Sequence, residues 1–389
     1  MKKAQIQSKA NEVHDEIIVI REHLHQFPEL SFKEFETSKY IQSILTQWKI
    51  EFSVVCETGI VGVISPSTKV DKCIALRADI DALPIVEENT ASYSSKNKGV
   101  MHACGHDVHS AMLLGALKII NQNKDSLTCQ VKFIFQPGEE KLPGGAKLMI
   151  EENVLENPKV DEIYALHVFP ELEVGKVGLK GGMYMASCDE IYMTVNGKGG
   201  HGAMPHQTID PILTAAHIIT ALQQIVSRNC SPIIPSVLSF GRIEGLGATN
   251  VIPNEVKLEG TFRTMNESWR ENAHHLIKKQ ATFIANGFGA SVDVNIIKGY
   301  PYLENNEVLT EQSKQKLIAH FDSNHVIDLP IRMTGEDFAF FAQKVPATFI
   351  RIGVRNEAEG IIYPVHNSKF DIDTKALKIG IETLLTLVY

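Results

Sequence analysis

The chain has no long apolar run and no block of charge of one sign. None of its apolar stretches approaches the roughly 18 residues that a membrane-spanning helix requires. The formal net charge of −8 is spread along the sequence, without acidic or basic segments. We therefore expect no membrane span and no surface for nucleic acid or anionic lipid.

Cysteine is also scarce, and its spacing shows no disulfide framework or secretory context. The start of the chain, MKKAQIQSKANEVHDEIIVI, lacks the apolar core and small-residue cleavage site of a signal peptide. Most of the cysteines lie in apolar, strand-like surroundings, which favours reduced thiols and a cytoplasmic location. The six cysteines are Cys56, Cys73, Cys104, Cys129, Cys188 and Cys230.

The sequence contains no internal repeat, no low-complexity tract and no G-x-S-x-G motif. The last absence argues against a Ser-His-Asp hydrolase of the nucleophile-elbow type. What remains is an ordinary globular composition, with 22% charged and 44% hydrophobic residues. A length of 389 residues allows two to three domains with a large buried core.

Apolar residues recur at helical spacing near the start of the chain and predict a helix over residues 5–26. Ser31 and Glu34 form a capping-box pattern, which predicts that a second helix begins there. Strand-like and helix-like runs then alternate, which predicts a mostly parallel sheet covered on both faces. The expected strands are 51–55, 59–65, 73–81, 130–135, 162–168 and 347–353, and the expected helices are 109–121, 144–155, 306–320, 335–344 and 373–388.

The pattern changes at about residue 186. The expected strands there are 189–199, 236–245, 255–264 and 291–300, and the expected helices are 210–228 and 267–287. This β-α-β-β-α-β order is typical of a ferredoxin-like α+β module with its own core. Because α/β elements resume afterwards, we expect one discontinuous domain of residues 1–185 and 297–389, with residues 186–296 inserted as a second domain.

Two segments, HACGHDVHSAML and FIFQPGEEKLPGGA, carry the strongest chemical signal. They place Cys104 and His106 on one tight turn and the adjacent carboxylates Glu139 and Glu140 on the next loop. Thiolate, imidazole and carboxylate are the ligands of a hydrolytic metal centre, and a second carboxylate can act as a base. The polar residues Asp79, Asp81 and His167 also follow predicted strands, at the sheet edge where open α/β folds bind ligands.

Each of these residues also has an ordinary structural interpretation. Cys104 and His106 could be a buried thiol beside a turn histidine, and a Glu-Glu pair is usually solvated. His109, three residues after His106, is more consistent with packing. His167 at the end of a strand and His366 in a loop are, taken singly, more often structural than ligands. The metal interpretation gains its weight from their convergence on one sheet edge, where two carboxylates repel each other unless a cation lies between them.

The motifs HACGHDVH, QPGEE, ALHV, GKGGHGAMPH, TGEDFAFF and YPVHNSKFD together resemble the N-acyl-amino-acid amidohydrolase family, which includes hippurate hydrolases and plant auxin-conjugate hydrolases. The resemblance begins at REHLHQFPELSFKEFET and covers essentially the whole chain. It implies a di-metal α/β catalytic domain with an inserted α+β lid that also mediates dimerisation. This agrees with the inserted module expected from the strand and helix pattern.

The resemblance also implies a role for each motif residue. Glu139 is the general base, and Asp81 orients a ligand from outside the metal sphere. Related metallopeptidases have a histidine where this chain has Asp79, so the role of Asp79 stays open, as do those of Glu336 and Asp337. The implied metal ligands are Cys104, His106, Glu140, His167 and His366.

Three further residues lie in the expected lid. By resemblance, His201 in GKGGHGAMPH donates a hydrogen bond to the developing oxyanion. Asn250 and Arg263 are assigned to the carboxylate end of the substrate, since a guanidinium can hold a carboxylate with two hydrogen bonds. If the lid forms the dimer contact, His201 can serve the metal centre of the partner subunit.

The expected function is therefore hydrolysis of the amide bond of an N-acyl amino acid by two divalent metal ions. Zinc suits this ligand set, with manganese, cobalt or nickel as alternatives. The rival functions are a dipeptidase or carboxypeptidase on the same centre and a non-catalytic binding protein on the same scaffold. The expected assembly is a homodimer through the lid, or a homo-oligomer built from such dimers. The acyl group, the amino acid and the pathway are not specified by the sequence.

Overall fold

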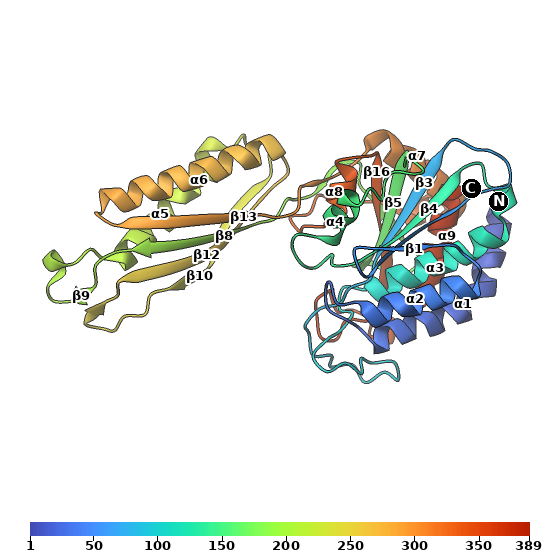
Figure 1. Ribbon diagram of the computed structural model, residues 1–389, viewed down its shortest axis with the longest axis horizontal. Coiled ribbons are helices and arrows are strands. Elements are labelled where there is room, and N and C mark those ends of the chain that lie inside the picture. Colours follow the sequence, from blue (N-terminus) through green and yellow to red (C-terminus); the bar gives the residue numbers. More distant parts are fainter. The chain divides into compact units, whose positions relative to one another are not determined.

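The computed structural model describes residues 1–389 and divides into two compact units (Figure 1). We call the first the α/β unit and the second the inserted unit, because its main segment interrupts the sequence of the first. The α/β unit consists of Met1–Met183, Glu304–Ile331 and Asp337–Tyr389, and the inserted unit of Tyr184–Leu303 and Arg332–Glu336.

The α/β unit is built on an eight-stranded sheet with the order β1-β2-β4-β3-β5-β16-β6-β15. Its four central strands pair in parallel, and the antiparallel pairs lie toward the sheet's two sides. The predicted α/β fold class is therefore confirmed. The strands are β1 (Ser53–Val55), β2 (Gly59–Ile64), β3 (Cys73–Asp79), β4 (Gln130–Gln136), β5 (Glu162–Glu173), β6 (Val177–Leu179), β15 (Val326–Asp328) and β16 (Ala347–Arg355).

Helices cover this sheet, and α1, α3 and α9 pack against one another. Burial explains their sequences: α3 is buried along almost its whole length, whereas α1 is buried only on its predicted apolar stripe. Strand β3 is buried at every position, as expected for a strand covered on both faces. The helices are α1 (Lys3–Gln26), α2 (Phe35–Gln47), α3 (His106–Gln122), α4 (Gly145–Glu151), α7 (Glu307–Phe321), α8 (Ala339–Ala342) and α9 (Lys375–Val388).

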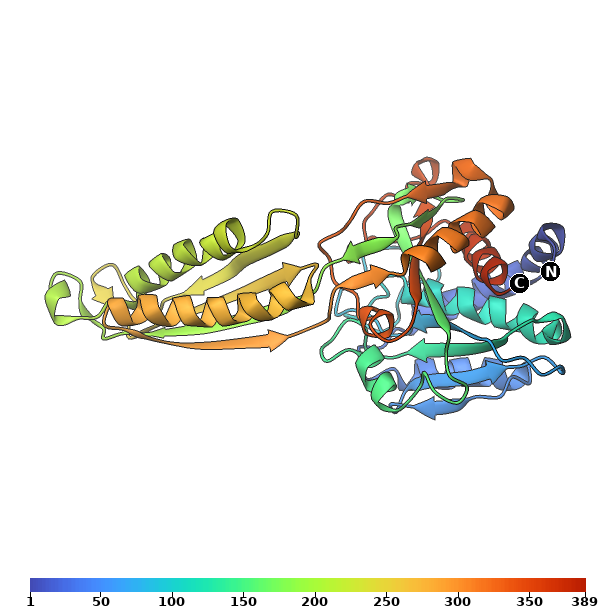
Figure 2. The same ribbon diagram turned by 90° about the horizontal axis from the view of Figure 1, so that it is seen from above.

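The inserted unit has the predicted β-α-β-β-α-β order and an antiparallel sheet ordered β10-β12-β8-β13. Both of its helices lie side by side on one face of this sheet (Figure 2). Alternate residues of β8 are buried beneath them, which gives the unit its own apolar core. Its elements are β8 (Asp189–Asn196), α5 (Pro211–Gln224), β10 (Ser236–Glu244), β12 (Glu255–Thr264), α6 (Glu267–Gly287) and β13 (Ser291–Lys298).

Two short ribbons complete the structure. One pairs β9 with β11 at one end of the inserted unit (Figure 1), and the other pairs β7 with β14 where the chain passes between the units. The ribbon strands are β7 (Gly182–Met185), β9 (Gly200–His201), β11 (Val251–Ile252) and β14 (Leu303–Asn305). No helix in the protein combines the length and apolar character needed to cross a membrane.

The predicted capping box is wrong. Helix α2 begins at Phe35, and neither Ser31 nor Glu34 caps it with a side-chain hydrogen bond. Ser31 Oγ instead donates to Asp81 Oδ2 over 2.7 Å, and Glu34 Oε1 accepts from the backbone N–H of Gly138 over 2.8 Å. Instead of capping α2, the two side chains bind the loops that carry Asp81 and the Glu139-Glu140 pair.

Candidate metal centre and active site

The candidate ligands of the α/β unit gather near the carboxyl ends of β3 and β4, beside the middle of β5. Asp79 is the last residue of β3, and Glu139 and Glu140 follow β4 by a few residues. The strand containing His167 does not end there, as the sequence suggested, but continues to Glu173. Its pairing with β3 stops at Ala165, so His167 lies two residues past the last pair with β3, although it still pairs with Arg351 of β16 on its other side.

A glycine turn sets Cys104 and His106 on either side of Gly105 at the start of α3. Gly105 has a φ of 81°, a left-handed conformation, and a Cβ there would lie 2.6 Å from Val168 Cγ2. Only glycine satisfies both conditions without strain. The turn thereby brings the thiol and the imidazole close to each other and to the β5 backbone.

Two groups of potential ligands share Cys104. In the first, Cys104, His106 and His167 are all buried, with Cys104 Sγ 3.5 Å from His167 Nε2. In the second, Cys104 joins Glu140 and His366, whose Nε2 lies 3.0 Å from Glu140 Oε1. Within each group the possible ligand atoms lie within 4.8 Å of one another. The His366 loop is tied to the same place, because its backbone N–H donates to Ala103 over 2.7 Å.

Two buried atoms of this cluster, His106 Nε2 and Glu140 Oε1, lie 4.0 Å apart and form no hydrogen bond of good geometry, although Glu140 Oε1 is within 3.0 Å of His366 Nε2. The Nδ1 of His106 lies 3.1 Å from Asp81 Oδ1, and when it donates there the lone pair of Nε2 is free, with Asp79 Oδ2 at 3.8 Å. Lone pairs buried in this way are costly unless a cation accepts them. The mixed sulfur, nitrogen and oxygen donor set fits a divalent metal of the zinc type.

The local electrostatics also favour positive charge beside His106. Burial lowers the pKa of His106, but Asp79, Asp81 and Glu140 raise it to about 10. Burial and the Arg351 guanidinium hold the pKa of His167 well below its ordinary value, so that imidazole is neutral, as a metal ligand must be. The carboxylates around His106 thus favour positive charge, which a metal ion can supply in place of a proton, and His167 is in the neutral form that binds a metal.

Asp81 holds the cluster together from behind. Besides His106, it accepts hydrogen bonds from Ser31 Oγ and from the backbone N–H of Glu140, the latter over 3.0 Å. Burial acts to raise the pKa of Asp81, but these hydrogen bonds bring it below its ordinary value. The ionised Asp81 carboxylate therefore orients the His106 ring and the backbone of Glu140 at the same time.

Glu139 is buried next to this cluster, with 7% of its surface exposed. It forms a compact group with His106 and Glu140. Its Oε1 accepts a long hydrogen bond, 3.4 Å, from the backbone N–H of Asp337. A carboxylate held at this place can exchange a proton with a water molecule at the ligand cluster.

In a third group, Asp79 with His106 and His109, hydrogen bonds already engage His109 and Asp79. Asp79 Oδ1 accepts from His109 Nδ1 over 2.6 Å, and Asp79 Oδ2 accepts from Arg77 over 2.6 Å. The Nε2 of His109 accepts from the backbone N–H of Val168 over 2.9 Å. Both ring nitrogens of His109 are therefore engaged, whereas each Asp79 oxygen keeps a second lone pair, and Asp79 Oδ2 lies 3.8 Å from His106 Nε2.

Sequence analysis missed Arg77, Gln136 and Ser31 as parts of this region. Arg77 lies at the centre of a buried network, donating to Gln136, Asp79 and Asp337. A signal was present, because Arg77 and Gln136 stand in mainly apolar strands and are themselves buried. A charged side chain in such a strand requires a buried partner.

The other predicted site residues belong to the inserted unit. His201 is exposed on β9, and its Nδ1 accepts from the backbone N–H of Ala203 over 3.0 Å. The neutral imidazole therefore carries its proton on Nε2, where it is free to donate outward. Asn250 is exposed beside it, and its carbonyl accepts from Gly202 over 2.8 Å. His201 and Asn250 thus form one exposed pair.

Arg263 lies at the other end of the same unit. It is half-buried near the end of β12 and donates to the Met333 carbonyl over 3.1 Å. Asn250 precedes the start of β12 at Glu255, and Arg263 follows that residue by eight positions. At about 3.3 Å per residue, the strand separates Glu255 from Arg263 by roughly 26 Å. A small substrate cannot contact Asn250 and Arg263 of the same chain together.

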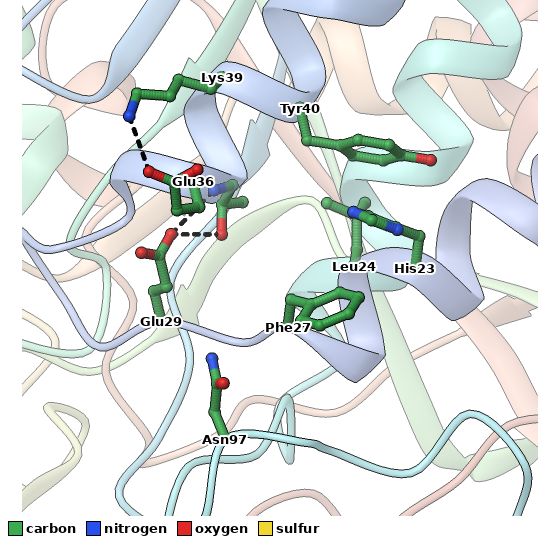
Figure 3. Close-up of a pocket in the computed structure, with 9 residues that line it drawn as sticks. His23, Leu24, Phe27, Glu29, Glu36, Lys39, Tyr40 and Asn97 are labelled. Atoms are coloured by element: carbon green, nitrogen blue, oxygen red, sulfur yellow. Dashed lines mark hydrogen bonds and ion pairs between the residues drawn. The ribbon is translucent and has the colours of Figure 1, made fainter.

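A separate pocket of about 450 Å³ lies between α1 and α2 (Figure 3). Its wall includes the stacked rings of His23 and Tyr40, 3.8 Å between centroids, and Phe27. Glu29, opposite these rings in Figure 3, accepts from the backbone and hydroxyl of Thr37. None of the candidate metal ligands lines this pocket, and neither does the proposed base Glu139. The catalytic interpretation therefore stays with the cluster around Cys104.

Comparison with known proteins identifies the family. The model of Peptidase family M20/M25/M40 matches residues 75–389. An N-acyl-L-amino acid amidohydrolase of Geobacillus stearothermophilus is 42% identical over 301 residues, 77% of this chain and 80% of its own length. Thermostable carboxypeptidase 1 of Saccharolobus solfataricus is 38% identical over 379 residues, 96% of this chain and 95% of its own.

The crystal structure of the Bacillus subtilis YXEP protein, a dinuclear metal-binding peptidase of the M20 family, has the same fold. It superposes with a TM-score of 0.82 at 32% identity and covers 97% of this chain and 98% of its own. The family resemblance predicted from the motifs is confirmed by these relatives.

Proposed function

Because the chain belongs to peptidase family M20/M25/M40, we propose that it is a binuclear metal-dependent amidohydrolase of N-acyl amino acids. The products are a carboxylate and a free amino acid. The observation that carries this proposal is the sharing of Cys104 by two ligand groups with Glu139 buried beside them. The names of the amidohydrolase relative and of the dinuclear structure support the same chemistry.

In this proposal Cys104, His106 and His167 hold one divalent ion, and Cys104, Glu140 and His366 hold the second. When bound, such ions lower the pKa of water and polarise the substrate carbonyl. Zinc suits the donor set, and manganese, cobalt and nickel are the alternatives. Asp81 orients His106, as metal-bound histidines generally require of a neighbouring carboxylate.

Glu139 acts as the general base and then as the general acid. It removes a proton from the attacking water and delivers it to the nitrogen of the leaving amine. The backbone N–H of Asp337 restrains Oε1 of this carboxylate. Hydrolysis of the amide then balances, with the hydroxyl on the acyl carbon and the proton on the released amine.

The inserted unit completes the site as a lid and a dimerisation domain. His201 and Asn250 of the partner subunit meet the substrate together with Arg263 of the first chain. The strand from Glu255 to Arg263 alone spans roughly 26 Å, and this length supports the division between two chains. His201 donates from Nε2 to the oxyanion, and Arg263 holds the substrate carboxylate.

An exposed edge strand supports the proposed dimer. Strand β10 is an edge of the inserted sheet and exposes Val237 and Ile243. Ile212 of α5, also exposed, lies next to the end of this strand at Gly245. An unpaired apolar edge readily pairs with a second copy of the same strand. The six free cysteines support a reducing, cytoplasmic location.

A carboxypeptidase or dipeptidase on the same centre is the second candidate, favoured by the name of the Saccharolobus solfataricus relative. The two functions are separated by assaying acetyl-, benzoyl- and aminoacyl-amino acids side by side. The protein is first stripped with a chelator and then reloaded with zinc, manganese, cobalt or nickel. We expect cleavage of acetyl or benzoyl amides only after reloading.

Faster cleavage of aminoacyl substrates would favour the peptidase. Activity that survives metal removal verified by elemental analysis would refute the mechanism. No turnover of any substrate by fully loaded protein would favour a binding protein.

A further inference from the structure

His109 is the buried histidine nearest to the candidate centre that the proposed mechanism leaves unused. It lies on α3 with 2% of its surface exposed, and its ring centroid is 4.5 Å from that of His167. Both of its nitrogens are engaged, by Asp79 on one side and the Val168 backbone N–H on the other. It therefore contacts a candidate ligand without being available as one.

The Val168 residue is held on both sides by histidines. Its N–H donates to His109 Nε2 over 2.9 Å, and its carbonyl accepts from His167 Nδ1 over 2.7 Å. The second bond fixes the proton of His167 on Nδ1 and leaves the lone pair of Nε2 facing Cys104 Sγ at 3.5 Å. The orientation of His167 therefore depends on the backbone that His109 restrains.

His109 is in turn fixed by a chain of buried charges. Asp79 accepts from His109 and from Arg77, and Arg77 also donates to Asp337 over 2.8 Å. Asp79, Arg77 and Asp337 are all buried, with exposures of 2% or less. Because each has several partners, the ring of His109 has one stable orientation and one tautomer.

We propose that His109 is a positioning residue for the metal centre: held by Asp79, it sets the orientation of His167 through Val168. It thereby determines the affinity for the ion of the Cys104, His106 and His167 group. This inference rests on the proposed function, because that function supplies the metal. Neighbouring groups of this kind typically change metal affinity by about 10–100-fold when they are lost.

The test compares variants of His109 that keep one of its two hydrogen bonds. His109→Gln can accept from Val168, whereas His109→Asn can reach only Asp79, because its amide occupies the place of Nδ1. His109→Leu loses both bonds. Each protein is loaded with zinc, and the two binding affinities are measured by competition with a chromophoric chelator, alongside the metal content and the thermal midpoint.

We expect two ions in the wild type and a loss of about 10–100-fold in the affinity of one ion in His109→Leu and His109→Asn. His109→Gln should stay within about threefold of the wild type. Cobalt-loaded protein gives a second readout, because the thiolate-to-cobalt absorption of Cys104 should change in the first two variants only.

The matched control is His320→Leu. His320 is also a buried histidine with a carboxylate partner, Glu382, at 2.6 Å, but it lies between α7 and α9. The His320→Leu variant should lower the thermal midpoint of unfolding without changing the affinity for either ion. Unchanged affinities in His109→Leu and His109→Asn, beside a two-ion wild type, would overturn the inference alone. A wild type that binds no divalent ion would instead refute the proposed function and remove the inference with it.

Discussion

The two units treat ionisable side chains in opposite ways. The α/β unit buries many of them in hydrogen-bonded networks around the candidate centre. Of its acidic, basic and histidine side chains, the inserted unit buries only Asp189, Arg270 and Glu336, and the first two pair with each other. The buried charged residues around the candidate centre include Arg77, Asp79, Asp81, His106, His109, Glu139, His167 and Asp337.

This difference separates a preorganised site from an incomplete one. In the α/β unit, hydrogen bonds fix His106, His167 and the backbone of Glu140 before any ion or substrate arrives, whereas His366 is exposed. His201 and Asn250 of the inserted unit are exposed and bonded only to their own ribbon. Residues of this kind acquire a function only against a second surface.

The largest expected effect comes from removing the proton acceptor of the buried centre. Glu139→Gln keeps the shape of the side chain but cannot accept a proton, so turnover should fall by about 10²–10⁴-fold while both ions stay bound. Glu140→Gln should lose metal as well as activity. Steady-state kinetics and elemental analysis distinguish the two, and the reverse result would show that base and ligand had been exchanged.

The next largest effect should come from His201 of the inserted unit, which we propose serves the active site of the partner subunit. His201→Ala removes an oxyanion donor and should lower turnover by about 10²–10³-fold without changing metal content. Mixing His201→Ala with Glu139→Gln under subunit exchange should restore activity, approaching one working site per mixed dimer. If exchange is verified and the mixture stays inactive, the site is not shared between chains.

Arg263 should give a smaller effect that depends on the substrate. Arg263→Lys keeps the charge but loses the two-pronged hydrogen bonding, so we expect about tenfold weaker binding of N-acyl amino acids. Analogues with an amidated carboxylate should be affected little. Comparing KM for matched acid and amide substrates checks this, and equal losses would mean that Arg263 does not recognise the carboxylate.

The smallest expected effect concerns the pH dependence of stability. Burial and the nearby Asp81 raise the pKa of Glu34 from 4.5 to about 7. The folded state therefore binds this proton more tightly than the unfolded chain, and stability is lost as the pH rises from about 4.5 through 7. Glu34→Gln should remove that loss, at most about 3 kcal/mol, because the pKa rises by about 2.5 and one pKa unit corresponds to about 1.4 kcal/mol.

Thermal unfolding of Glu34→Gln and wild type between pH 5 and pH 8 measures this difference. Asp189 of the inserted unit is the contrast: burial acts to raise its pKa, but Arg270 and His274 bring it below 3.8. Its contribution is present above that pH and is lost only as the pH falls further. A gap between Glu34→Gln and wild type that stays constant over the whole range would contradict the role of Glu34.

The sequence by itself determined most of the long elements and the set of reactive residues, but it did not predict the short strands β6, β7, β14 and β15, and the helix expected over 335–344 is only Ala339–Ala342. The apolar positions of α1 predicted from periodicity, such as Ile6, Val13 and Ile17, are buried. The order of elements in the inserted unit followed from alternation and helical spacing, because both patterns are local and regular. The motif residues were visible because thiol, imidazole and paired carboxylates are rarely placed together without a chemical reason.

Only the tertiary structure decided which partner each buried polar group has. Ser31 and Glu34 formed a convincing local pattern, yet they bond to Asp81 and Gly138. Arg77 meets Asp337 across 260 positions of sequence. A buried charge must be satisfied by whatever group the fold brings within reach, and that proximity is set by the packing of distant strands rather than by neighbours in the chain.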